Sequence, residues 1–116
     1  MSLWGRLTAS RAEQEAEELR LAAAAEQSTP LASCGHGQVA TVSGTVRAIT
    51  VRPKHETPAL EAEVYDGSAA VRVVWLGRRR IPGIDPGRRI TLHGRITRPD
   101  DVMTMYNPRY ELKPST

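Results

Sequence analysis

Residues 75–112 read WLGRRRIPGIDPGRRITLHGRITRPDDVMTMYNPRYEL, and they carry the strongest structural signal in the chain. A strand ends in an arginine cluster, and a connector rich in Pro and Gly follows it. In residues 89–96 apolar and polar side chains alternate, which predicts a strand with one buried face. Pro99-Asp100-Asp101 predicts a turn, and a last strand is expected from Val102–Tyr106 onward, with Asn107-Pro108 ending its regular part.

Two more strands and a hairpin are predicted upstream of this stretch. A long strand covers residues 38–52, and Gly44 lies where its apolar alternation changes phase, a position typical of a bulge. Residues 60–65 and 69–76 flank Asp66-Gly67, which is a hairpin turn signal. Five strands in this order, with glycine breaks, are typical of the OB fold, a small Greek-key barrel that mostly binds nucleic acid.

Residues 10–27 predict an N-terminal helix. Ser10 and Glu13 have the spacing of a capping box, and most of the residues that follow are good helix formers. Thr29-Pro30 ends the helix. We therefore expect a mainly β protein, a five-stranded OB-fold Greek-key barrel with an N-terminal α-helix. The predicted organisation is a helical extension at 1–30, a linker at 31–37, the OB-fold domain at 38–112 and a C-terminal tail at 113–116.

Composition favours an anionic partner and a reducing compartment. The formal net charge is +3, and residues 1–30 hold three Arg and five Glu, so the excess of positive charge lies in the rest of the chain. The single cysteine, Cys34, excludes an intramolecular disulfide. No apolar run approaches the roughly 18 residues of a membrane span, and Met1–Ser10 lacks the apolar core of a secretory signal. We expect a cytoplasmic protein.

The sequence offers little support for catalysis or for a metal centre. Cys34, His36, His55 and His93 do not form the closely spaced ligand pairs of structural zinc sites. No nucleophile and base occur in a recognisable context. We expect neither a cofactor, nor a metal, nor an enzymatic activity.

The run from Val71 through PGRRITLHGRI (Pro86–Ile96) to MYNPRYEL (Met105–Leu112) resembles the OB-type wedge domain of the branch-migrating DNA helicase RecG. In that family a strand of aromatic character precedes a Pro-Gly-basic segment, a strand containing Gly and an N/H-P-x-Y-E ending. The chain, with VWLGRRRI (Val74–Ile81), is also similar to small standalone OB-fold proteins of actinobacteria, usually described as nucleic-acid binders. The resemblance covers about residues 38–112.

This resemblance implies a basic barrel that contacts branched or single-stranded DNA, with Trp75 and Tyr106 on its aromatic surface. The chain has no P-loop and no room for motor domains, so ATP hydrolysis and strand translocation do not carry over.

The predicted nucleic-acid-binding residues are basic and aromatic side chains on the strands and their loops. Arginine forks bind phosphate oxygens in a bidentate way, and aromatic rings stack on bases. The sequence leaves open whether the Trp75 ring lies in the core or on the ligand surface. The predicted set is Arg47, Arg52, Lys54, Tyr65, Arg72, Trp75, Arg78, Arg79, Arg80, Arg98, Tyr106 and Arg109.

Glu61 and Glu63 oppose this prediction, because they share the outward face of their strand with Tyr65 and repel phosphate. Cross-strand pairing with Arg47 or Arg72 is the alternative explanation for them. The favoured function is non-catalytic binding of single-stranded or branched DNA through phosphate contacts and base stacking, in DNA repair or recombination.

Two alternatives remain open at this point, an RNA-binding OB module and a protein-interaction adaptor. The adaptor would dock through the acidic N-terminal helix. That helix could also shield the basic face within the chain.

Overall fold

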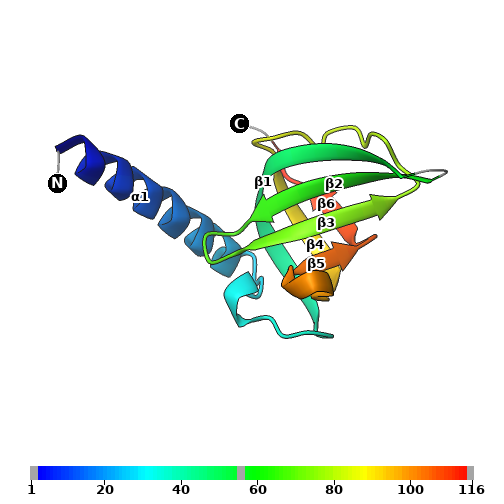
Figure 1. The fold of residues 1–116 in the computed structure, drawn as a ribbon. Helices are drawn as coiled ribbons and strands as arrows, with labels where there is room; N and C mark the ends of the chain where they lie inside the picture. Colours follow the sequence, from blue (N-terminus) through cyan, green and yellow to red (C-terminus); the bar gives the residue numbers. More distant parts are fainter. Residues whose placement is uncertain (1–2, 55–56, 115–116) are drawn as a thin grey trace.

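The computed structural model describes residues 3–54 and 57–114, with side chains for 10–24, 26–52 and 57–114. One helix leads into a curled β-sheet (Figure 1). No helix in these residues is both long enough and apolar enough to cross a membrane. In chain order the elements are α1 (Leu3–Ala25), the 3₁₀ turn η1 (Leu31–Ser33), β1 (Val39–Lys54), β2 (Thr57–Tyr65), β3 (Ala70–Leu76), β4 (Arg89–Arg95), the 3₁₀ turn η2 (Pro99–Asp101), β5 (Thr104–Tyr106) and β6 (Arg109–Leu112).

The six strands form one mixed sheet in the order β5-β3-β2-β1-β4-β6. Every neighbouring pair is antiparallel except β3 and β5, which run parallel. A mainly β protein with an N-terminal helix is therefore confirmed. The predicted number of five strands is wrong, because Pro108 has no N–H for a ladder and the closing segment divides into β5 and β6.

The strand pairing gives the sheet two edges, β5 and β6, where a closed barrel was expected. Only Asn107 and Pro108 separate these two edge strands along the chain. Thr97 and Thr104 also form an isolated antiparallel bridge, in which each N–H donates to the other carbonyl at 2.8 Å. The two edges are thus held near each other by the chain itself.

β1 divides its length between two partners. Residues 39–45 pair with β4, and residues 45–54 pair with β2. The register shift lies between Val46 and Ala48, so the bulge predicted at Gly44 is wrong in position. Gly44 is needed for another reason, since a Cβ there would lie 2.5 Å from the Tyr65 carbonyl oxygen. The strand therefore crosses close over the end of β2 at Gly44.

The core is formed by the inward faces of the strands and by two connecting segments. Trp75, which is 5% exposed, lies in this core, and its ring packs edge-on against Tyr110 with centroids 5.8 Å apart. Leu31 and Cys34, from the segment expected to be a linker, are buried in the same cluster. The core also includes Val42, Val46, Leu60, Ala62, Val64, Val71, Val73, Ile81, Ile84, Ile90, Leu92, Ile96, Met103 and Met105.

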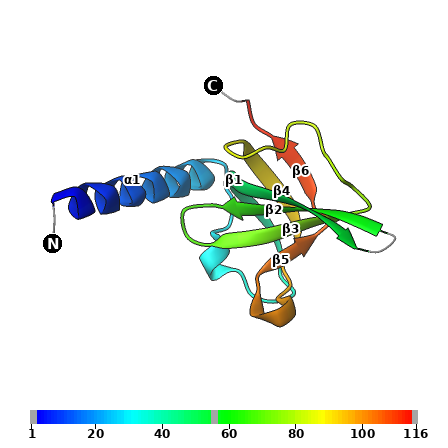
Figure 2. The same cartoon turned by 45° about the horizontal axis from the view of Figure 1, so that its top comes forward.

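The N-terminal helix begins at Leu3, so the capping box predicted at Ser10 is wrong and Ser10 lies inside the helix. No proline interrupts residues 3–9, and the helix continues through them. Figures 1 and 2 show the helix extending away from the sheet. It therefore does not cover the outer face of β1, β2 and β3, and shielding of that face by the helix is not the arrangement in this structure.

The end of the helix is tied to the sheet by polar contacts. Arg20 donates from Nη1 to the Gly67 carbonyl at 3.2 Å. The Ser28 and Ser43 hydroxyls lie 2.6 Å apart, and the Ser43 and Thr91 hydroxyls lie 3.0 Å apart. Thr91 Oγ1 donates to Glu26 Oε2 at 3.3 Å. The hydrogen bond with Ser43 is the main cause that lowers the pKa of the Glu26 carboxyl, and the charge of Lys113 acts in the same direction.

This pKa shift predicts a pH-dependent contribution of Glu26 to stability. Because the pKa in the folded state lies below the ordinary value of 4.5, the contribution is present above about pH 4.5 and is lost as the pH falls through the folded-state pKa. We expect Glu26→Gln to be less stable than the parent at pH 7, and we expect the difference to shrink as the pH falls from 4.5 through the folded-state pKa, in urea unfolding followed by circular dichroism. A destabilisation that stays the same from pH 7 down into the acidic range contradicts this role.

Candidate nucleic-acid interface

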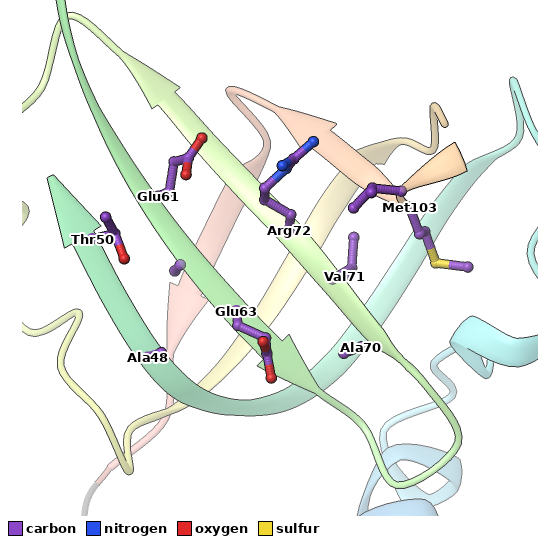
Figure 3. Close-up of a pocket in the computed structure, with 10 residues that line it drawn as sticks. Ala48, Thr50, Glu61, Glu63, Ala70, Val71, Arg72 and Met103 are labelled. Atoms are coloured by element: carbon purple, nitrogen blue, oxygen red, sulfur yellow. The ribbon is translucent and has the colours of Figure 1, made fainter. Parts of the chain in front are cut away.

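Side chains on the outer face of β1, β2 and β3 form three cross-strand rows. One row contains Ala48, Glu63 and Arg72, because Ala48 is paired with Glu63 and Glu63 with Arg72. The register places Thr50, Glu61 and Val74 in the next row, and Arg52, Ala59 and Leu76 in the third. Figure 3 shows several of these side chains together on the face that the helix leaves open.

Two adjacent hollows lie on this face. The first has a volume of about 330 Å³, and Ala48, Thr50, Glu63 and Met103 are among the residues that line it. The second has a volume of about 540 Å³. Both hollows are lined by Glu61 and Arg72, so they form one continuous surface, which we call the outer groove. The second hollow is also lined by Arg52, Thr57, Ala59, Val74, Leu76, Pro99, Asp100 and Tyr106.

The ionisable side chains that line the outer groove are two arginines, Arg52 and Arg72, and three carboxylates, Glu61, Glu63 and Asp100. Arg52 Nε lies 2.7 Å from Glu61 Oε2, so Glu61 pairs with Arg52. The pairing of Glu61 with Arg47 or Arg72 that was expected from the sequence is wrong. The Arg52 side chain of this pair is 49% exposed and the Glu61 side chain 13%, and an ion pair open to solvent on one side contributes about 1 kcal/mol. Among the side chains that the structure describes, Glu63 forms no ion pair with Arg72 although the two residues are opposite each other. Arg72 Nε is buried and has no hydrogen-bond partner among them.

Two of the predicted aromatic residues line or border this face. Tyr106 is 48% exposed and lines the second hollow. Tyr65 is half-buried, and its hydroxyl donates to the Gly67 carbonyl at 3.3 Å. The Arg47 guanidinium carbon lies 3.6 Å from the centroid of the Tyr65 ring and covers one face of it. Trp75 is in the core, so its ring is not available for stacking on a base.

The arginine cluster Arg78–Arg80 is exposed and lies just beyond the end of β3. Two hydrogen bonds fix the start of this connector. The Gly77 N–H donates to the Pro58 carbonyl at 2.7 Å, and the Leu76 N–H donates to Asn107 Oδ1 at 2.9 Å. Leu76 lines the second hollow and shares a row with Arg52 and Ala59, so Arg52 and the start of the cluster at Arg78 lie at this end of the outer groove. Arg109 lies on β6, opposite His93 of β4.

Other predicted residues lie apart from the groove or lack a described side chain. Arg98 donates from Nη2 to the Cys34 carbonyl at 3.3 Å and so ties the segment before β5 to η1. Lys54 is the last residue of β1, and its side chain lies outside the described residues. The sequence prediction did not include Thr50, Glu61, Glu63 and Met103 in the site, although the alternation along the second strand already put both glutamates on the outward face.

The structure contains no clustered metal ligands in the part of the chain that it describes. There, no three His, Cys, Asp or Glu side chains lie close enough together to hold a metal ion. His93 lies on β4 and its Nδ1 is 3.0 Å from the Thr41 hydroxyl. Cys34 is buried, and this burial raises the pKa of its thiol.

Comparison with known proteins gives a fold-level similarity. No protein-family model matches the chain, and no curated protein matches it. A solved structure of RecG bound to a three-way DNA junction is similar, with a TM-score of 0.56 and 16% sequence identity. The similarity covers 69% of this chain and 11% of the RecG chain, so this protein corresponds to a small part of that structure. At this identity the likeness is one of fold.

Proposed function

We propose that this protein is a non-catalytic OB-type module that binds single-stranded or branched DNA along the outer groove. Three observations favour the OB barrel. β3 pairs in parallel with β5, β4 pairs antiparallel with β6, and only Asn107 and Pro108 divide β5 from β6. Taken as two halves of one bent strand, β5 and β6 complete a ring of five strands, which is the OB arrangement.

The observation that carries the ligand proposal is the outer groove with arginines at one end. OB folds bind oligonucleotides on the face of the second and third strands, and the outer groove lies on this face. Arg78, Arg79 and Arg80 supply donors for phosphate oxygens. Tyr106 supplies an exposed ring for stacking on a base. Because the similar RecG structure contains a DNA junction, we favour DNA as the ligand and a role in DNA repair or recombination.

Fluorescence anisotropy with single-stranded, duplex and forked DNA, and with matched RNA, tests this proposal. We expect binding to single-stranded and forked DNA, and we expect log K to fall linearly with log salt by about 0.7 per phosphate contact. Absence of binding to every oligonucleotide at low salt contradicts the proposal. An affinity that does not change between low and moderate salt also contradicts it.

Arg79→Gln separates contact with phosphate from overall charge. We expect this variant to bind more weakly and to have a shallower salt slope, because it removes a phosphate donor from the cluster. Arg11→Gln is the matched control, since Arg11 is exposed on the projecting helix and the charge change is identical. An equal loss of affinity in both variants indicates a general charge effect and counts against the cluster as a contact site.

Tyr106→Ala tests base stacking in the groove. A stacked base contributes about 1–3 kcal/mol, so we expect an affinity loss of about 5- to 150-fold with little change in the salt slope. The exposed position of Tyr106 predicts that the free energy of unfolding changes little. If the affinity of this variant is unchanged, Tyr106 does not stack on a base of the bound strand.

The projecting helix favours a second candidate function, a protein-interaction adaptor. Glu13, Glu17 and Glu18 are exposed on α1, which extends away from the sheet. A partner that remains bound in a pull-down after nuclease treatment, and is lost when residues 1–24 are removed, supports the adaptor. Tighter binding of the matched RNA than of DNA in the anisotropy series supports an RNA-binding module instead.

A further inference from the structure

We propose that Glu63 and Arg72 form a subsite for a guanine base in the outer groove. This inference rests on the proposed function, because it specifies which base of a bound single strand the groove prefers. It also gives a role to Glu63, a carboxylate that is unfavourable next to a phosphate backbone.

The two residues face the same hollow with complementary hydrogen-bonding groups. They are directly opposite each other on β2 and β3, so their Cβ atoms are about 5 Å apart on one face of the sheet. Both line the hollow of about 330 Å³, within the size range of small-ligand sites (Figure 3). Ala48, Ala70 and Met103 add apolar surface to the same hollow, on which the flat face of a base can lie.

Neither group is neutralised by a neighbour among the described side chains. Glu61 is paired with Arg52 at 2.7 Å, whereas Glu63 and Arg72 take part in no ion pair there. The buried Nε–H of Arg72 has no hydrogen-bond partner in the same residues. A buried donor without a partner is unfavourable, so a ligand that brings an acceptor within its reach is favoured.

The chemistry of this pair matches guanine. A carboxylate only accepts hydrogen bonds and a guanidinium only donates them, so the ligand must present donors to one and acceptors to the other. Guanine has the N1–H and N2–H donors for the Glu63 carboxylate, and it has the O6 and N7 acceptors that arginine binds in a bidentate way. Cytosine and adenine offer Glu63 a single amino group, and thymine offers one imino N–H between two carbonyls. In single strands these base edges are accessible to side chains.

The test compares dT₁₂ with the same oligomer carrying one guanine at its centre, by anisotropy at low and moderate salt. We expect the guanine oligomer to bind at least about fivefold more tightly, a ratio corresponding to about 1 kcal/mol. Because base contacts release no counterions, this ratio is expected to be the same at both salt concentrations. Central inosine, which lacks the N2 amino group, and central 7-deazaguanine, which lacks N7, are each expected to lose part of the preference.

Glu63→Gln replaces one acceptor oxygen of the pair by a donor, and we expect it to abolish the preference while dT₁₂ binds as well as before or better. Arg72→Gln is the second variant and is expected to lose the same preference. Glu15→Gln, on the exposed helix, is the matched control and is expected to keep it. Equal unfolding midpoints for the parent and the Glu63 variant show that the fold is retained.

The possible failures are distinguishable. If dT₁₂ and the guanine oligomer bind equally, or if adenine or cytosine is preferred, the guanine subsite is wrong while the proposed function stands. If Glu63→Gln raises affinity for both oligomers by the same factor, Glu63 acts only through its charge and the subsite is also wrong. If neither oligomer binds at low salt, the proposed function itself is contradicted.

Discussion

Trp75→Ala is expected to lower the free energy of unfolding by about 3–5 kcal/mol, the usual cost of removing a large aromatic side chain from a core. The Trp75 ring is 5% exposed, it packs edge-on against Tyr110, and it lies opposite Leu60 on β2. Its removal therefore leaves a cavity that these neighbours cannot fill. Urea unfolding followed by circular dichroism measures the loss without depending on tryptophan fluorescence.

Trp75→Phe is the control for this prediction. Phenylalanine keeps most of the ring volume and removes the buried indole N–H, which has no hydrogen-bond partner among the described residues. We therefore expect a much smaller loss than in Trp75→Ala. If Trp75→Ala has unchanged stability but binds DNA more weakly, the core position of Trp75 is contradicted and a position on the ligand-binding surface is supported.

Asp66→Ala is expected to cost about 3 kcal/mol or more of stability. The Asp66 side chain is 1% exposed, and its carboxylate accepts four hydrogen bonds. Oδ2 accepts from the Leu31 N–H at 2.7 Å. Oδ1 accepts from the Ser68 N–H at 2.8 Å, the Ser68 hydroxyl at 2.7 Å and the Ala69 N–H at 3.1 Å. The alanine variant leaves these donors without an acceptor, and each buried one costs about 1–3 kcal/mol.

Thermal or urea unfolding of Asp66→Ala, Asp66→Asn and Ser68→Ala tests this network. Asn keeps one acceptor oxygen, so Asp66→Asn is expected to lose less stability than Asp66→Ala. Ser68→Ala removes one donor and leaves the carboxylate its three backbone partners, so its loss is expected to be the smallest. If all three variants are as stable as the parent protein, the hydrogen bonds of Asp66 do not stabilise the junction between η1 and the β2–β3 turn.

The sequence predicted the parts of this fold that depend on local pattern. The alternation of Leu60, Ala62 and Val64 gave the buried face of β2, and Asp66-Gly67 gave the β2–β3 turn. Features that depend on tertiary contacts were predicted less well. The end of the regular strand at Asn107-Pro108 was expected, but the pairing of residues 109–112 with β4 as a sixth strand was not. The bulge falls after Val46, because the pairing partners of β1 change there.

The candidate site was predictable in composition but not in arrangement. Arg52, Arg72 and Tyr106 were expected and do line the outer groove. The pairing of Arg52 with Glu61 depends on a cross-strand register that follows a bulge, so the residue pattern did not reveal it. The chain has no phenylalanine, so the sequence alone did not show whether the Trp75 ring fills the core or lies on the surface. The contact with Tyr110, which places the ring in the core, is a long-range contact that the residue pattern does not reveal.

The division of β1 between two partners has a consequence for self-association. Beyond the bulge, in the part of the chain that the structure describes, β1 is paired only with β2, so its other side presents free backbone N–H and C=O groups. Such an edge is a template on which another chain can add a strand and aggregate. The bulge after Val46, the charge of Arg52 and the missing N–H of Pro53 are the features by which natural sheets discourage such additions. These three features make the unpaired side of β1 a poor template for strand addition.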